Sequence, residues 1–288
     1  MNLKQTCRLF AKALSDSSAS PFADARVILS SVMGIKETQF ISEFEKEVPP
    51  DKEIIIKEAL RRRLNGEPVA YITGERGFYQ YVFKVTKDVL IPRPDTETLV
   101  ESAVEDIKVA FKDKTEINIL DLCCGSGCIG ISAAKALVKN FKRISLTLSD
   151  ISDGALEVCR ENIKSLITES NIKAEIVKSS LFDSLAGRSF DAILSNPPYI
   201  KTSVIETLET QVQFEPHIAL DGGKDGLDFI RAIARQAKNS LVPKGLLQME
   251  IGYDQSPAAA KILKEENFSD VSVLKDLGQR ERVVKGRN

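Results

Sequence analysis

Residues 117–131 read INILDLCCGSGCIGI, and this stretch decides the fold. The apolar run Ile117–Leu122 predicts a short buried strand, and the apolar residues after the glycines resume at helical spacing. Gly125 and Gly127 permit a tight turn and a close backbone approach to a ligand, while the following helix start offers free amide donors. With Gly130 they satisfy the G-x-G-x-x-G spacing, which alone is weak evidence for a dinucleotide site. An ordinary strand-to-helix turn would also explain the loop.

From Ile117 onward, strand-like runs alternate with helical ones. Such alternation predicts an α/β fold in which a parallel sheet carries helices on both faces, and ligands of such sheets bind beyond the carboxyl ends of the strands. Two later runs, Val271–Leu274 and Arg282–Val284, predict a last strand that returns as an antiparallel hairpin. The predicted strands are Ile117–Leu122, Ile144–Ser149, Ala174–Val177, Asp191–Ser195 and Gly245–Ile251, and the helical segments are Ile129–Val138, Asp153–Ile167 and Leu227–Leu241.

Upstream of the loop, apolar residues recur at spacings of three and four residues, which predicts a small helical bundle. The segments with this spacing are Leu3–Leu14, Phe22–Met33 and Ile54–Leu64. Arg61, Arg62 and Arg63 are expected to form a solvated face of the last of them, where an acidic partner could bind.

Between Gly74 and Ile91 the period changes to that of short extended segments, and a Pro-Arg-Pro turn then interrupts the chain. A helix over Thr96–Val109 is expected to follow. The sequence therefore predicts an N-terminal helical domain over residues 1–73, a hairpin linker over 74–95 and the α/β domain over 96–288.

The composition narrows the class of protein. The chain has 288 residues, of which 43% are hydrophobic and 28% charged, as in ordinary globular proteins. A formal net charge of -1 gives no support to sequence-independent nucleic-acid binding, which needs a dense Lys/Arg surface, so a protein or small-molecule substrate is favoured. No apolar run approaches the roughly 20 residues of a membrane span, and no secretory segment begins the chain. We expect a cytoplasmic protein that does not bind membranes.

The five cysteines are odd in number and scattered, which favours reduced thiols over a disulfide framework. Cys123, Cys124 and Cys128 do not form a C-x-x-C pair, and no second Cys/His pair follows. His217 is the only histidine. No metal site is therefore expected.

Asp150 stands at the end of the second predicted strand. A carboxylate there can accept two hydrogen bonds from the vicinal hydroxyls of a ribose, a group that nicotinamide and adenosylmethionine cofactors share. A lone Asp in this place can equally cap the next helix. The role of Asp150 therefore has to be inferred together with the other motifs of the sequence.

The most specific signal is Asn196-Pro197-Pro198-Tyr199, which directly follows the strand Asp191–Ser195. An amide nitrogen is a poor nucleophile while its lone pair is delocalised into the carbonyl. The Asn196 side-chain oxygen and the Pro197 backbone oxygen can each accept one of its N–H groups and so turn the lone pair toward a methyl donor. Tyr199 can supply an aromatic wall over the planar group. These residues predict methyl transfer to a planar amide or amine nitrogen.

Three other classes of protein share part of this pattern. A nucleic-acid adenine N6-methyltransferase uses a similar motif, because the exocyclic amine of adenine is also a planar nitrogen. A nicotinamide-dependent oxidoreductase would account for the glycine loop and Asp150 but leaves Asn196–Tyr199 without a purpose. A non-catalytic binding protein is the third class, and the intact motif argues against it.

The whole chain resembles the peptide chain release factor glutamine methyltransferases, the HemK/PrmC family. Several of the matching segments have no general methyltransferase meaning, so together they single out this family. The segments are Gly66–Gly74 (GEPVAYITG), Leu90–Glu97 (LIPRPDTE), the glycine loop, Asn196–Tyr199, Glu215-Pro216 and Gln279–Gly286.

The resemblance implies a class I methyltransferase with a Rossmann-like seven-stranded sheet and an N-terminal helical domain that helps to recognise a release factor. It implies S-adenosylmethionine as the methyl donor and, as the acceptor, the side-chain amide nitrogen (N5) of the glutamine in the release factor's Gly-Gly-Gln motif. No direct sequence-specific binding of nucleic acid is expected.

The resemblance also assigns residues by position. Asp150 would hold the ribose, Leu181 would border the adenine, and Asn196 would also reach the cofactor. The loop residues that would line the cofactor site are Cys123, Cys124, Gly125, Ser126 and Gly127, and those that would grip the glutamine are Asn196, Pro197, Pro198 and Tyr199, with Asn196, Pro197 and Tyr199 as the catalytic set.

Two positions depart from the family pattern. Cys123 and Cys124 replace the Gly-Thr pair that is common in the loop, and Leu181 stands where some relatives have a large aromatic residue. Both departures could change the affinity for the cofactor, and neither removes a group that methyl transfer needs.

Overall fold

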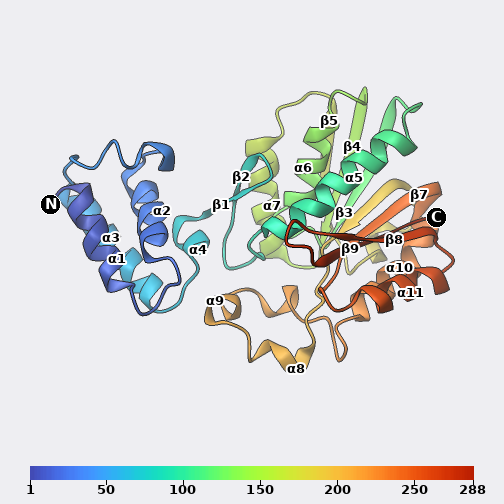
Figure 1. Cartoon of the computed structure of the whole chain (residues 1–288). Coiled ribbons are helices and arrows are strands. Elements are labelled where there is room, and N and C mark those ends of the chain that lie inside the picture. Colours follow the sequence, from blue (N-terminus) through green and yellow to red (C-terminus); the bar gives the residue numbers. More distant parts are fainter. The chain divides into compact units, whose positions relative to one another are not determined.

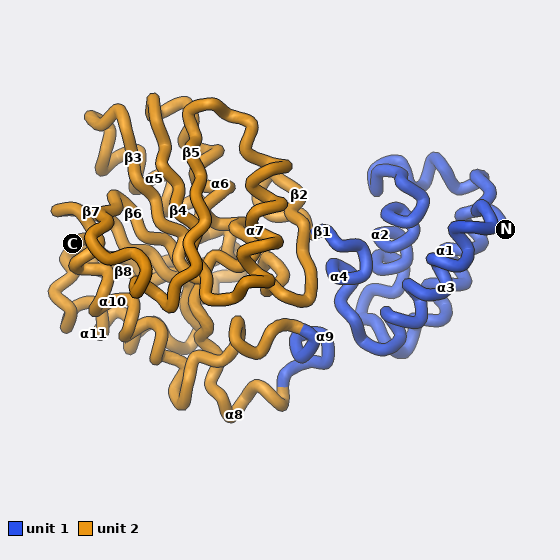
Figure 2. Tube along the Cα trace, turned by 180° about the vertical axis from the view of Figure 1, so that it is seen from behind, with its two compact units in different colours: residues 1–75, 208–214 blue, residues 76–207, 215–288 orange.

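A computed structural model describes all 288 residues of the chain. Two compact units make up the molecule, and Figure 2 shows them in different colours. Unit 1 comprises Met1–Glu75 and Leu208–Phe214, and unit 2 comprises Arg76–Thr207 and Glu215–Asn288.

Unit 1 is helical (Figure 1). Its first helix begins with a capping box, because the Asn2 side chain accepts from the Gln5 amide and the Gln5 side chain accepts from the Asn2 amide. Pro21 opens the second helix, and Gly34, with φ of 68°, ends it. The elements are α1 (Leu3–Ala13), α2 (Pro21–Met33), η1 (Glu37–Gln39), α3 (Pro50–Leu64), α4 (Val69–Thr73) and α9 (Thr210–Gln213).

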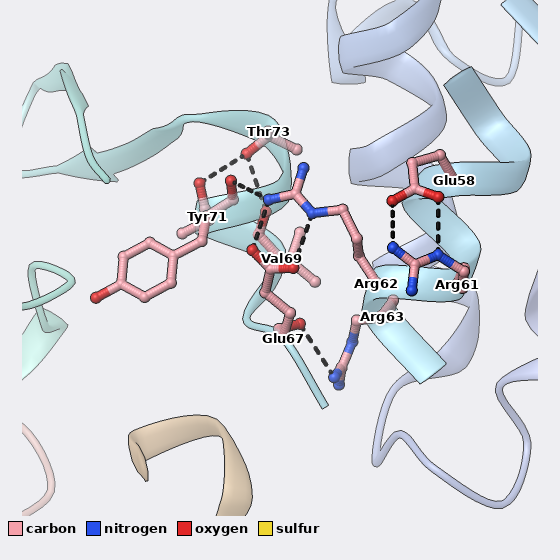
Figure 3. A network of polar contacts seen from close by, with 9 residues as sticks. Glu58, Arg61, Arg62, Arg63, Glu67, Val69, Tyr71 and Thr73 are labelled. Atoms are coloured by element: carbon pink, nitrogen blue, oxygen red, sulfur yellow. Dashed lines mark hydrogen bonds and ion pairs between the residues drawn. The ribbon is translucent and has the colours of Figure 1, made fainter. Parts of the chain in front are cut away.

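The predicted solvated face of three arginines is wrong for one of them and incomplete for another. The Arg63 side chain is only 2% exposed, and its Nε donates to Asp24 at 2.8 Å. Arg62 forms a bidentate pair with Glu67 and also donates to the Tyr71 carbonyl at 3.1 Å (Figure 3). Arg62 therefore stabilises the α3–α4 connection, whereas Arg63 ties α3 to α2, because its buried charge needs a partner.

Unit 2 contains the predicted seven-stranded sheet, in the order β5-β4-β3-β6-β7-β9-β8. β3 pairs in parallel with β4 on one side and with β6 on the other, while β9 is antiparallel to both β7 and β8. The sheet strands are β3 (Glu116–Leu122), β4 (Arg143–Asp150), β5 (Ile172–Lys178), β6 (Phe190–Ser195), β7 (Leu241–Glu250), β8 (Ser269–Lys275) and β9 (Glu281–Arg287).

Alternation along the strands fills two separate cores, one on each face of the sheet. Ile117 and Ile119 of β3 belong to the first core, with buried residues of α5, α6 and α7, whereas Leu120 and Leu122 belong to the second, with α10 and α11. The helices are α5 (Glu97–Ala110), α6 (Cys128–Ala136), α7 (Asp153–Leu166), α8 (Thr202–Ile205), α10 (Asp228–Ser240) and α11 (Ser256–Glu265), with the short turns η2 (Pro94–Thr96), η3 (Asp183–Leu185) and η4 (His217–Ala219).

The predicted hairpin before this domain is a two-stranded sheet of β1 (Glu75–Phe78) and β2 (Tyr81–Lys84). No helix in the structure is both long enough and apolar enough to cross a membrane.

The order of the strands reverses at β3, which has β4 on one side and β6 on the other. In open α/β sheets, ligands bind at the carboxyl ends of the strands beside such a reversal.

Candidate functional site

A cavity of about 230 Å³ lies at the carboxyl ends of β3, β4 and β6. Most of the residues singled out by sequence line it, although they come from distant parts of the chain. They are Cys123, Cys124, Gly125, Ser126, Asp150, Leu181, Asn196 and Pro198. Gly127, Pro197 and Tyr199 are not among the lining residues.

The glycine loop is tied to the ends of its two strands. The Gly125 amide donates to Asp150 Oδ2 at 2.9 Å, and the Cys124 amide donates to the Ser149 carbonyl at 3.0 Å. Gly127 is the N-cap of α6 with φ of 79°, and a Cβ there would lie 2.9 Å from the Cys159 sulfur. Only glycine meets both demands at this position, so Gly127 shapes the loop from behind the cavity wall.

Asp150 is held by the backbone on both of its oxygens. Its Oδ1 accepts from the Ser152 amide at 3.0 Å, in addition to the Gly125 bond on Oδ2. A carboxylate oxygen has a further lone pair, so both oxygens can still accept from a ligand in the cavity. Asp150 is therefore oriented before any ligand arrives.

Asp121, which no motif had singled out for a role, lies buried beneath this loop. Its Oδ2 accepts from the Gly130 amide at 2.8 Å, and its Oδ1 has no hydrogen-bond partner. Burial raises the pKa of Asp121 to about 8, and the neighbouring Asp150 charge adds to the effect. Asp121 is therefore a neutral acid through much of the acidic and neutral range.

Asn196 directly follows β6 and lines the cavity, and its Nδ2 donates to Thr96 Oγ1 at 3.4 Å. Pro197 and Pro198 are buried. The Tyr199 hydroxyl donates to Glu250 Oε1 at 3.0 Å, and burial, together with the Glu250 charge, raises the pKa of Tyr199. This segment is thus held at both ends by polar bonds to η2 and β7.

The sequence prediction assigned no function to several residues that lie in or beside the cavity. Glu215 is buried, accepts from the Ile91 amide at 3.1 Å and forms an ion pair with Arg93, which lines the cavity. Desolvation raises the pKa of Glu215, and Arg93 opposes the shift. Thr96 also lines the cavity, and Glu250 lies behind it. The family segments Leu90–Glu97 and Glu215-Pro216 were the signal in the sequence, but spacing alone does not show that they meet.

Of the two loop cysteines, Cys124 is buried and Cys123 is half-buried. Burial raises the pKa of Cys123 to about 12, and the nearby Asp150 charge contributes. The pKa of Cys124 is also raised, by its contact with Cys159 and by burial. A thiol in this state is a weak nucleophile and a poor metal ligand. In the structure, no group of three or more His, Cys, Asp or Glu side chains is arranged to hold a metal ion.

Comparison with known proteins agrees with this geometry. The family model described as the PrmC N-terminal domain matches residues 5–74, and the one described as the methyltransferase small domain matches residues 101–215. A methyltransferase from Pyrococcus furiosus has a similar fold, with a TM-score of 0.51 at 15% identity over 82% of this chain and 98% of that chain.

Curated relatives match nearly end to end. The release factor glutamine methyltransferase of Caulobacter vibrioides is 38% identical over 92% of this chain and 89% of its own length. That of Agrobacterium fabrum is 39% identical over 92% of this chain and 90% of its own length. The strand order, the cavity above β3 and β4, and these matches together place this chain in the release factor glutamine methyltransferase family.

Proposed function

We propose that this enzyme transfers a methyl group from S-adenosylmethionine to the side-chain amide nitrogen of the glutamine in the Gly-Gly-Gln motif of a peptide chain release factor. The observation that carries the proposal is the Asn196 amide. Its nitrogen is engaged by Thr96, so its oxygen is left as an acceptor at the wall of the cavity. This is the group that must receive an N–H of the substrate.

The residues around the cavity fit S-adenosylmethionine. Asp150 keeps free acceptor capacity for ribose hydroxyls, and the apolar side chains of Leu90, Ile151 and Leu181 line the cavity for the adenine. A Cβ on Gly125 would meet nothing within 4 Å, so the loop backbone there is open to a ligand. We therefore propose that residues 123–126, Asp150, Leu181 and Asn196 contact the cofactor as the sequence predicts, and that Gly127 serves the site by shaping the loop.

When bound, the cofactor supplies an activated methyl group on a sulfonium. The chain's own residues hold the acceptor. The Asn196 Oδ1 and the Pro197 carbonyl would each accept one N–H of the glutamine amide, which directs the nitrogen lone pair along the line of transfer. Pro198 and Tyr199 complete the grip, and the bond from Tyr199 to Glu250 fixes the position of its ring. The product proton can leave to solvent, so the transfer needs no dedicated base.

We further propose that unit 1, with the predicted boundary near residue 73, recognises the release factor. In unit 1, Arg62 and Arg63 are paired with Glu67 and Asp24, so these two arginines add no unpaired charge to its surface. The near-neutral net charge of -1 suits a protein partner better than a nucleic-acid backbone. The five free cysteines suit the reducing cytoplasm, where we place the reaction.

Methylation of a purified release factor tests the proposal. The full chain and S-adenosylmethionine should yield a peptide one methyl heavier at the Gly-Gly-Gln glutamine, as read by mass spectrometry. Asn196→Ala should keep its fold and cofactor affinity but lose roughly 10²–10³-fold in turnover, the usual effect of removing one preorganised polar group. Asp150→Ala should instead weaken cofactor binding by roughly 1.5–3 kcal/mol, as expected when a charged acceptor is lost.

A release factor with Ala in place of that glutamine is the matched substrate control. If the intact factor stays unmodified while DNA or RNA acquires the label, the adenine alternative replaces the glutamine assignment. Normal turnover of Asn196→Ala would mean that another group holds the acceptor.

A further inference from the structure

Glu250, at the end of β7, is a buried carboxylate beside the site with one oxygen unaccounted for. It is 1% exposed, its Oε1 accepts from the Tyr199 hydroxyl at 3.0 Å, and its Oε2 has no hydrogen-bond partner. Burying a polar atom without a partner is costly, so such an atom calls for a reason.

Thr96 offers the complementary group. It is 2% exposed, and its Oγ1 accepts from Asn196 Nδ2 at 3.4 Å. A hydroxyl has one proton, so a threonine that accepts from Asn196 must place its proton on a different acceptor. Burial raises the pKa of Glu250, and hydrogen bonding by the Thr96 and Tyr199 hydroxyls opposes the shift. The Thr96 hydroxyl and the unpartnered Oε2 of Glu250 are thus a complementary donor and acceptor.

The direction of this chain of hydrogen bonds fixes the Asn196 amide. An ionised carboxylate only accepts, so Thr96 and Tyr199 must both donate to it. Thr96 is then available to Asn196 only as an acceptor, so the amide presents its NH₂ group to Thr96. The reversed amide would set its oxygen against the threonine oxygen. The NH₂ end faces Thr96, and the Oδ1 end is left for the acceptor nitrogen.

We propose that Glu250 is a positioning residue that acts through Thr96 to set the orientation of the Asn196 amide, and through Tyr199 to hold the other end of the same segment. The inference rests on the proposed role of Asn196 in binding the acceptor. It adds a requirement that the four-residue motif does not contain, because the orientation is set from η2 and β7.

Two neighbouring charges act on the pKa of Glu250 in opposite directions, Arg282 by lowering it and Asp95 by raising it. Arg282 of β9 acts on it from one side and is itself paired with Asp95 at 2.9 Å and with Asp276 at 3.2 Å. The Glu250 charge in turn raises the pKa of the Cys128 thiol in α6. In acid, a protonated Glu250 gains a donor of its own and can reverse the bond to Thr96. Turnover should then fall on the acid side.

Four variants and their kinetics with the release factor test the inference. Thr96→Val and Glu250→Gln should each lose roughly 10²-fold in kcat, the usual effect of misplacing a reacting group, with little change in KM or in cofactor affinity by calorimetry. The double variant should lose no more than the worse single one, because both changes break one chain of bonds. Thr96→Ser keeps the hydroxyl and should retain most of the turnover. The acid limb of the kcat–pH profile should vanish in Glu250→Gln.

Ile233→Val is the matched control for lost stability. Ile233 is fully buried in α10 and belongs to the core that α10 and α11 form with the sheet. It should lower the thermal midpoint without lowering kcat. If Glu250→Gln fails to fold, Thr96→Val and Thr96→Ser still decide the question between them.

The inference fails, while the proposed function stands, if Asn196→Ala is inactive and Thr96→Val keeps normal kcat. It also fails if the losses of the two single variants multiply in the double variant, or if Thr96→Ser is as slow as Thr96→Val. If Asn196→Ala itself turns over normally, the proposed role of Asn196 falls first.

Discussion

At the scale of single residues, Cys123 stands out because it holds a backbone conformation that suits glycine. Its φ is 59°, in the left-handed region, and its neighbours in the chain are the strand end and the cavity wall. A side chain in this region costs roughly 1–2 kcal/mol. Leu181, the other departure from the family pattern, also has a positive φ of 46°. Both unusual residues therefore occupy strained positions beside the cavity, as is common at functional sites.

Replacing Cys123 with glycine should stabilise the cofactor-free protein by about 1 kcal/mol, because glycine adopts this conformation without steric strain. Urea unfolding followed by circular dichroism measures the change. Cys123→Ala is the matched control, since it removes the thiol and keeps the strain, and it should not stabilise the protein. Equal midpoints for Cys123→Gly and Cys123→Ala would show that φ is not the source of the effect.

Asp121 should make stability depend on pH in an unusual direction. Its pKa is raised from 3.8 to about 8 in the folded chain, so unfolding releases a proton over that interval. The stabilisation from this group is complete below the unfolded pKa and is lost as pH rises through the folded pKa, with a slope of at most about 1.4 kcal/mol per pH unit. Between about pH 4 and 8 this group therefore makes the folded state progressively less stable.

Asp121→Asn should remove this dependence, because the amide is neutral at every pH. Urea unfolding of both proteins without cofactor, at several values across that range, should show the variant gaining on the wild type as pH rises. The comparison uses the slope of the free energy of unfolding against pH, so a loss of stability that the extra N–H of the amide causes at every pH does not affect it. Parallel curves would mean that Asp121 is ionised in the folded protein.

At the scale of elements, α6 lies against β3 at a distance that only glycine allows. A Cβ on Gly130 would lie 2.7 Å from the Cβ of Asp121 and 3.0 Å from Leu146 Cδ1. These two elements carry the glycine loop between them, so their spacing decides where the loop amides point. The last glycine of the G-x-G-x-x-G pattern is thus explained by helix-to-strand packing and not by the ligand.

Gly130→Ala should therefore destabilise the protein by roughly 1–3 kcal/mol through overpacking. This is the opposite of the gain of about 1 kcal/mol that alanine gives at an open helical position. Gly77→Ala in β1, where a Cβ would meet nothing within 4 Å, is the control and should change the thermal midpoint little. A more stable Gly130→Ala would show that β3 and α6 separate easily.

At the scale of the whole molecule, all residues that line the cavity belong to unit 2, and both of its cores are built from unit 2 alone. Unit 1 has a core of its own. The cavity therefore does not depend on unit 1 for its walls.

A chain that lacks residues 1–75 should bind S-adenosylmethionine nearly as well as the full chain but methylate the release factor far more slowly. Calorimetry and mass spectrometry measure the two properties. A short peptide with the Gly-Gly-Gln sequence is the control substrate, and both chains should methylate it at similar rates. Equal rates on the intact factor would remove unit 1 from substrate recognition.

Much of this molecule could be predicted from the sequence, because its signals are local. The alternation of strands and helices, the glycine loop and the Asn196–Tyr199 segment depend on neighbours in the chain, and the seven-stranded sheet confirms the predicted fold. The sequence prediction was wrong where a residue with a local surface pattern is buried by contact with a residue far away in the chain. Arg63 has the spacing of a solvated residue, yet Asp24 from another helix makes its burial possible.

The sequence by itself determined the fold and the family, since periodicity and motif spacing record burial and turn geometry, and it predicted most of the motif residues that line the cavity. Only the tertiary structure decided how those groups are oriented. Thr96 lies in η2, Asn196 directly follows β6 and Glu250 ends β7, so no spacing within one segment shows that these three residues are neighbours. Hydrogen-bond direction depends on which donors and acceptors are enclosed together, and packing across the sheet sets that arrangement.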